Sequence, residues 1–223
     1  MKKIFLKTMN LLPMMTLACG LARADVPTLP DAAMDTEITS SAAPKTETIV
    51  LAGGCFWGIQ AVFQHLKGVS QAVSGYAGGA ANTAKYGEVS TGSTGHAESV
   101  QVTYDPAQIT LGKILKVYFS VAHDPTELNR QGPDTGTQYR SEIFFTTPEQ
   151  EKVAKAYIAQ LQQAKAFSSP IVTKVSQLQG FFPAEDYHQN YATLHPDNPY
   201  IEINDLPKVA NLKKNFPELY VGK

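Results

Sequence analysis

One cysteine, Cys55, is the strongest candidate nucleophile in this sequence. It follows the double glycine Gly53-Gly54 and precedes two large aromatic residues, Phe56-Trp57. An apolar run over 49–51 predicts a short buried strand, and apolar residues at helical spacing over 56–66 predict a helix. Cys55 therefore lies in the first turn of a helix, where unpaired N–H groups and the helix dipole favour the thiolate. The pattern predicts a reactive thiol that ionises more easily than usual.

Proton donors and acceptors for such a thiol must come from other parts of the chain. Glu98 stands where a glycine-rich loop leads into an alternating strand, so partial burial can keep its carboxyl protonated and able to act as an acid. The other candidates are His96, His123, His188, Asp134, Tyr86 and Tyr139. Each also has a structural interpretation: Cys55 as a small buried apolar residue, and the others as solvated or core side chains. No spacing of His, Cys and acids resembles a set of metal ligands.

The elements that must position these residues follow from apolar periodicity and turn residues. Strands are predicted near 49–51, 69–76, 100–104, 143–145 and 171–175, and helices over 56–66, 110–121 and 147–166. This order predicts an α+β fold, a two-layer sandwich with a ferredoxin-like split β-α-β core and helices on one face of the sheet. One helix is additional to that core, and the residues from Gly180 onward, which lack a clear pattern, predict a long C-terminal coil.

Composition fits one globular domain. The 223 residues carry a formal net charge of −1 and no basic run, so we expect no nucleic-acid partner. A Pro-, Ala-, Thr- and Ser-rich stretch without periodicity predicts a flexible leader over 25–45, and the domain is expected over 46–223.

The first 24 residues have the pattern of a signal peptide. Basic residues precede an apolar run over 11–21 that is too short for a stable bilayer span, and Ala22-Arg23-Ala24 matches a small-x-small cleavage site. We expect cleavage after Ala24 and an exported, periplasmic protein. An alternative is a lipoprotein anchored through Cys19, because Thr16-Leu17-Ala18-Cys19 is similar to a lipoprotein cleavage box. An uncleaved membrane anchor fits the short apolar run less well.

Several motifs together resemble one enzyme family. Gly54-Cys55-Phe56-Trp57-Gly58 is similar to the signature of the A-type peptide-methionine sulfoxide reductases. The further matching motifs, in order, are Ser74-Gly75-Tyr76-Ala77-Gly78-Gly79, Tyr86, Thr94-Gly95-His96-Ala97-Glu98, His123-Asp124-Pro125, Arg130-Gln131-Gly132, Asp134, Gly136-Thr137-Gln138-Tyr139-Arg140-Ser141 and Ala184-Glu185-Asp186-Tyr187-His188-Gln189. The resemblance covers roughly 47–200, which is nearly the whole predicted domain.

The resemblance implies roles for four catalytic residues. The Cys55 thiolate would attack the sulfoxide sulfur, and Glu98 would protonate the sulfoxide oxygen. Tyr86 and Tyr139 would donate hydrogen bonds to that oxygen. Methionine would leave, and Cys55 would become a sulfenic acid.

The resemblance also implies how substrate binds. Phe56 and Trp57 would hold the ε-methyl group of a methionine-S-sulfoxide, either in a protein or as the free amino acid, and Asp134 would support the site. No metal and no organic cofactor is implied, and the role of His188 stays open. The implied biological role is repair of oxidised exported proteins.

The chain departs from many family members in its cysteines. Relatives often carry resolving cysteines near the C-terminus, whereas the predicted mature chain contains Cys55 alone. We therefore expect a one-cysteine enzyme whose sulfenic acid is reduced by a thioredoxin-like protein or another external thiol. Separately, we expect the enzyme to be a monomer. The alternatives are a secreted cysteine hydrolase that pairs Cys55 with a histidine, and a non-catalytic protein that binds oxidised methionine.

Overall fold

The computed structural model describes residues 28–36 and 46–222. Its strands are β1 (Glu47–Gly53), β2 (Val69–Ala77), β3 (Ala97–Tyr104), β4 (Arg130–Gln131), β5 (Asp134–Thr135), β6 (Ser141–Phe145), β7 (Lys174–Gln177) and β8 (Phe181–Pro183). Its helices are α1 (Phe56–Gln64), α2 (Tyr86–Val89), α3 (Leu111–Val117), α4 (Pro148–Gln163), α5 (Tyr191–Leu194), α6 (Pro199–Asn204) and α7 (Leu206–Asn215).

β1 lies at the centre of a six-stranded sheet in the order β7-β6-β1-β3-β2-β8. It pairs antiparallel with both β3 and β6, while β6 and β7 run parallel. Side chains alternate along β1, as the strand period requires. Ile49 and Leu51 enter the main core, whereas Val50 and Ala52 join a small cluster on the opposite face with Phe144.

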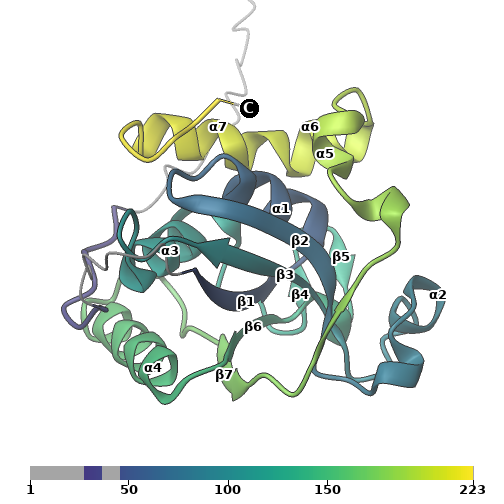
Figure 1. The fold of residues 1–223 in the computed structure, drawn as a ribbon, viewed down its shortest axis with the longest axis horizontal. Coiled ribbons are helices and arrows are strands. Elements are labelled where there is room, and N and C mark those ends of the chain that lie inside the picture. The colour runs from purple at the N-terminus through teal and green to yellow at the C-terminus, as the bar shows by residue number, and fades with distance from the viewer. Residues whose placement is uncertain (1–27, 37–45, 223) are drawn as a thin grey trace, which may run out of the picture.

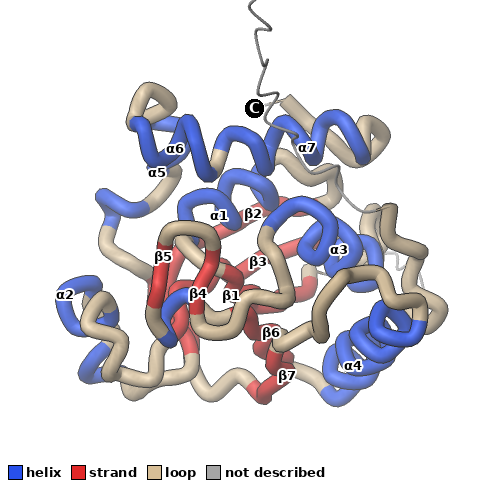
Figure 2. The backbone as a smooth tube through the Cα atoms, turned by 180° about the vertical axis from the view of Figure 1, so that it is seen from behind, coloured by secondary structure: helices blue, strands red, loops and turns tan. Residues whose placement is uncertain are grey.

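Three helices cover the main core face of the sheet (Figures 1 and 2). α1 contributes Ile59 and Phe63 to this core, α3 contributes Ile114, and α4 contributes Val153 and Tyr157. A sheet with helices on one face confirms the predicted α+β class. The β4–β5 hairpin forms a separate two-stranded sheet that lies beside the start of α1 in Figure 2.

The C-terminal part of the chain is helical, so the prediction of a long C-terminal coil is wrong. α5, α6 and α7 lie across α1 in Figure 1. Pro199 and Pro207 stand at helix starts, where a missing N–H is tolerated. α5 and α6 have four and six residues and are too short to show a helical period, and packing of buried residues such as Ile201 in α6 and Leu212 in α7 stabilises these helices.

Residues 28–36 lie against α3 and α4, which corrects the prediction of a flexible leader for this part of 25–45. Leu29 is buried in the main core, and the hydroxyl of Tyr157 donates to the carbonyl of Pro30 at 2.8 Å. Asp35 caps α3 from outside, since one carboxylate oxygen accepts from the backbone N–H of Gly112 at 2.6 Å. Residues 37–45 and the predicted signal peptide 1–24 lie outside the described residues.

Replacing Asp35 by Asn is expected to lower the free energy of unfolding by about 1–2 kcal/mol, since a charge-assisted helix cap is lost. Urea denaturation of the purified protein measures this. Asp31→Asn is the matched control in the same segment, because exposed Asp31 makes surface ion pairs with Lys113 and Lys116, and such pairs contribute little. Equal losses in the two variants would contradict a specific capping role.

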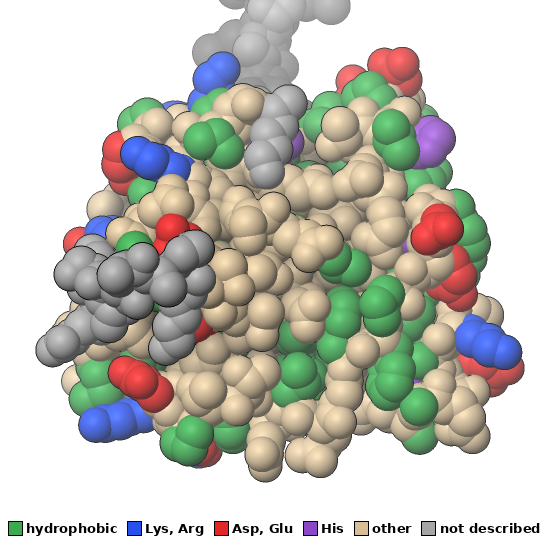
Figure 3. All heavy atoms as spheres, viewed as in Figure 1, with side chains coloured by type: hydrophobic (Ala, Val, Ile, Leu, Met, Phe, Trp, Pro, Cys, Tyr) green, Lys and Arg blue, Asp and Glu red, His purple; other side chains and the backbone are tan. Residues whose placement is uncertain are grey.

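The surface carries mixed charge. On the face drawn in Figure 3, lysine and arginine side chains lie apart from one another among neutral and acidic ones. None of the helices in the described part of the chain is long and apolar enough to cross a membrane.

Candidate active site

Cys55 sits between β1 and α1, in a turn that depends on glycine. It caps the N-terminus of α1, and Gly54 before it has φ +97°. A Cβ atom on Gly54 would lie 2.5 Å from Cγ of Gln131. Only glycine therefore combines this backbone angle with the close packing of β4 against the turn.

A pocket of about 200 Å³ opens at Cys55. It is lined by Cys55, Phe56, Trp57, Tyr86, Glu98, Asp134, Tyr139 and Tyr200. The structure thus brings together all seven residues to which the family resemblance gave a catalytic or substrate-binding role, from five separate segments of the chain. Tyr200, from α6, is an additional wall that the sequence analysis missed.

Glu98 is a buried carboxyl that faces this pocket from β3. It is 3% exposed, and one of its oxygens accepts a hydrogen bond from the backbone N–H of Phe56 at 3.1 Å. Burial raises the pKa of Glu98 to about 8, the Phe56 hydrogen bond opposes this, and the charges of Asp134 and Asp205 add to it. The carboxyl is therefore predominantly protonated at neutral pH and can donate a proton.

The prediction that the Cys55 thiol ionises more easily than usual is wrong for the resting site. Burial raises the pKa of Cys55 well above its usual value, and the nearby acids Glu98 and Asp205 raise it further. The backbone N–H of Trp57 favours the thiolate, as expected for a helix N-terminus, but burial outweighs it. The resting side chain is thus the neutral thiol.

Tyr86, at the start of α2, and Tyr139, in the turn before β6, face the pocket from two segments that hydrogen bonds join. Burial raises the pKa of both phenols, so they remain neutral hydrogen-bond donors. Side chains of the segment 137–140 donate to backbone carbonyls of the segment 90–95: Thr137 to Gly92, Gln138 to Ser90 and Arg140 to Gly95. These bonds fix the two phenols relative to each other.

Trp57 is held by residues from the C-terminal part of the chain. Its ring stacks on Tyr191 with a centroid distance of 3.9 Å, and its indole N–H donates to Nδ1 of His188 at 3.2 Å. The hydroxyl of Tyr200 donates to Asp134. His188 therefore orients a pocket wall, and burial lowers its pKa so that it stays neutral. The sequence gives no clear signal for Tyr191 and Tyr200 as pocket residues, because they lie on the short helices α5 and α6 in a part of the chain predicted to be coil.

Two candidate histidines lie away from the pocket. His96 bonds to the backbone of Gly79 and Ala80. His123 packs behind Gly53 and contacts the hydroxyl of Ser141 at 2.8 Å. Burial lowers the pKa of His123 to about 3, so it is a neutral structural residue. In the described ranges no group of His, Cys, Asp and Glu is arranged to hold a metal ion.

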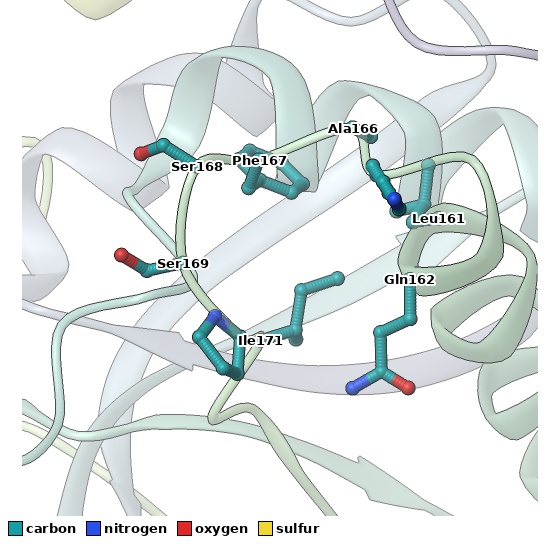
Figure 4. Close-up of a pocket in the computed structure, with 9 residues that line it drawn as sticks. Leu161, Gln162, Ala166, Phe167, Ser168, Ser169 and Ile171 are labelled. Atoms are coloured by element: carbon teal, nitrogen blue, oxygen red, sulfur yellow. The ribbon is translucent and has the colours of Figure 1, made fainter.

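A larger hollow of about 400 Å³ lies at the end of α4 (Figure 4). Its walls are Leu161, Gln162, Lys165, Ala166, Phe167, Ser168, Ser169, Pro170 and Ile171. Figure 4 shows the hydroxyls of Ser168 and Ser169 on the outer side of the loop. This hollow lacks an acid and a nucleophile aimed at each other, so the chemistry belongs to the smaller pocket at Cys55.

Comparisons with known proteins agree with this geometry. A family model described as peptide methionine sulfoxide reductase matches residues 47–220. The chain belongs to this family. The peptide methionine sulfoxide reductase MsrA 2 of Mesorhizobium japonicum is 61% identical over 82% of this chain and 93% of its own length. MsrA 2 of a Synechocystis strain is 49% identical over 85% of this chain and 89% of its own length.

Solved structures of relatives share the fold. The reduced form of Mxr1 from Saccharomyces cerevisiae has a TM-score of 0.62 and 32% identity, covering 72% of this chain and 91% of that one. Methionine sulfoxide reductase A of Corynebacterium diphtheriae has a TM-score of 0.59 and 36% identity, covering 76% of this chain and 85% of that one. The reductase is therefore an A-type enzyme, an oxidoreductase that converts methionine sulfoxide to methionine.

Proposed function

We propose that the reductase acts on methionine-S-sulfoxide, in proteins and as the free amino acid, with Cys55 as nucleophile and Glu98 as acid. One observation carries this proposal: the thiol and a carboxyl that is protonated at neutral pH line the same small pocket. A sulfoxide in this pocket meets a group that attacks sulfur and a group that protonates oxygen.

The proton balance of the step follows from the resting state. Glu98 gives its proton to the sulfoxide oxygen as the Cys55 sulfur attacks the sulfoxide sulfur, and the thiol proton then replaces it on Glu98. The attack forms a bond between the two sulfurs. The hydroxyl group then moves from the substrate sulfur to the Cys55 sulfur, so the sulfur–sulfur bond and the substrate sulfur–oxygen bond break while a bond from oxygen to the Cys55 sulfur forms. The substrate sulfur is reduced by two electrons, Cys55 is oxidised to a sulfenic acid, and Glu98 ends as it began.

The remaining walls orient the substrate. Tyr86 and Tyr139 supply neutral hydrogen-bond donors for an oxygen that gains electron density during attack. Phe56 and Trp57 form an aromatic wall suited to a methyl group on a sulfur that becomes more positive when its oxygen is protonated. Asp134 is held by Tyr200 and shapes the side of the pocket.

Regeneration of the thiol requires an external reductant in this proposal. Cys55 is the one cysteine in the described part of the chain, and Cys19 belongs to the proposed export signal. A thiol from a thioredoxin-like protein would attack the sulfenic acid, release water and form a mixed disulfide, which a second thiol would then reduce. We further propose that the protein repairs oxidised exported proteins in the periplasm, with anchoring through Cys19 as the alternative.

A single turnover without reductant tests this mechanism. A chain that begins at Asp25 is mixed with S-epimer methionine sulfoxide. The methionine formed is quantified, and the mass of the protein is measured by mass spectrometry. We expect one methionine per chain and one added oxygen on Cys55 that dimedone traps. The R epimer and a Cys55→Ser variant serve as controls and are expected to give no methionine. Product formed without modification of Cys55 would refute the proposed mechanism.

A further inference from the structure

A buried ion pair lies beneath the catalytic turn and has no part in the steps above. Asp205, between α6 and α7, accepts a hydrogen bond from the ammonium group of Lys208, with a distance of 3.1 Å from Nζ to Oδ1. The Asp205 side chain is fully buried, and its second oxygen has no hydrogen-bond partner among the residues that the structure describes. Such a half-satisfied buried carboxylate is costly, which points to a function beyond packing.

The pair lies on the Cys55 side of α1. A Cβ atom on Gly58 would lie 2.1 Å from Oδ1 of Asp205 and 2.8 Å from Nζ of Lys208. Gly58 lies in the first turn of α1, and Cys55 is the N-cap residue of the same helix. The pair therefore packs against the turn of α1 that begins at Cys55, and both charges act on the sulfur through a low-dielectric interior where charges interact strongly.

Other titratable groups also face Cys55. They are Tyr86 of α2, Glu98 of β3, Asp134 of β5, Tyr139 of the turn before β6, and Tyr200 of α6. Glu98 and the three phenols are predominantly neutral at pH 7. Asp205 is different: burial raises the pKa of its carboxyl, but the ammonium group of Lys208 beside it opposes that rise and favours the ionised form.

We propose that Asp205 and Lys208 are positioning residues that act on Cys55 through their charges: Asp205 adds to the burial that keeps the resting side chain a neutral thiol, and Lys208 opposes it. The inference rests on the proposed role of Cys55 as the nucleophile. The charges affect Cys55 in opposite directions, with Asp205 raising and Lys208 lowering the pKa of the thiol.

A neutral resting thiol protects an enzyme of this kind. A thiolate attacks hydrogen peroxide at oxygen: a sulfur–oxygen bond forms, the oxygen–oxygen bond breaks, hydroxide leaves, and sulfur is oxidised while peroxide is reduced. A thiol reacts far more slowly, because the thiolate is the nucleophile. With no second cysteine among the described residues to trap the sulfenic acid as a disulfide, limiting this reaction preserves Cys55 until substrate arrives.

The test is the pH dependence of iodoacetamide alkylation of Cys55, measured without substrate in the full domain. We expect the midpoint to fall by about one pH unit in Asp205→Asn and to rise by a similar amount in Lys208→Met. Peroxide should consume the thiol faster in the first variant and more slowly in the second. Exposed residues of the same helices provide matched charge controls, Glu202→Gln and Lys214→Met, which should leave the midpoint unchanged.

A purely structural role makes a different prediction. Loosening of α7 would expose Cys55 in both variants and move both midpoints in the same direction, which would overturn the proposal, as would unchanged midpoints. The double variant should return the midpoint close to that of the original protein, and Lys208→Arg should preserve it. Because alkylation reads the thiol directly, these results are separate from whether Cys55 reduces sulfoxide.

Discussion

Replacing Glu98 by Gln is expected to slow methionine formation in a single turnover by about 10²–10⁴-fold, the usual contribution of a positioned acid. Gln keeps the size of the side chain and can still accept from the backbone N–H of Phe56, as Glu98 does at 3.1 Å, but it has no acidic proton to give to the sulfoxide oxygen. Rapid-quench measurement of methionine at saturating sulfoxide isolates this chemical step from regeneration of the thiol.

The pH profile of this step distinguishes an acid from a mere binding group. Because burial raises the pKa of Glu98 to about 8, the single-turnover rate of the original protein should fall as pH rises through about 8. The residual rate of the Glu98→Gln variant should lack this descent. Glu88→Gln, an exposed acid on α2, is the matched control and should retain both rate and profile. If the loss of rate in Glu98→Gln were small and the descent persisted, another group would be the acid.

The same substitution is expected to stabilise the protein at alkaline pH. Glu98 has a pKa of about 8 when folded and near 4.5 when unfolded, so the folded state binds an extra proton between these values. Stability from this group is complete below pH 4.5 and is lost as pH rises through about 8. Gln cannot ionise, so Glu98→Gln should gain stability relative to the original protein across this window, by up to about 4–5 kcal/mol.

Urea unfolding measures this gain: the difference in free energy of unfolding between variant and original protein is determined at pH 5 and at pH 8.5, and the two differences are compared. At pH 5 the free energies of unfolding of the two proteins should differ only by the pH-independent effect of replacing a carboxyl by an amide. At pH 8.5 the midpoint of the variant should lie clearly higher. Parallel pH dependence in the two proteins would show that Glu98 is ionised in the folded state, and would argue against its role as an acid. A variant that is less active but more stable than the original protein would indicate that the buried carboxyl is retained for catalysis at a cost in folding stability.

Local sequence patterns predicted the elements that carry the main catalytic residues. The β1–α1 junction at Cys55 follows from an apolar run, two glycines and helical spacing, all within residues 49–66. The strand that carries Glu98 alternates cleanly from Val100 to Tyr104. Such signals are readable because one buried face imposes a period of 2 or 3.6 on neighbouring residues.

The remaining walls of the site could not be predicted in this way. Tyr191 and Tyr200 lie on α5 and α6, which have four and six residues and are too short to show a helical period, and Asp205 lies between α6 and α7. The raised pKa of Cys55 also depends on distant parts of the chain, since several segments bury the thiol. The helix N-terminus visible in the sequence is a weaker influence than this burial.

The position of Tyr200 and Asp205 has a consequence for how the enzyme comes into being. Because synthesis runs from the N-terminus, Cys55 and Glu98 emerge from the ribosome well before α6 and α7. Until they dock on α1, the nucleophile lacks one wall of its pocket and the charged pair beneath it. The arrival of α6 and α7 is therefore the step that completes the pocket. The thiol acquires its protected, selective form when the C-terminal helices close over α1, and a chain that loses them keeps its reactive groups without the surroundings that control them.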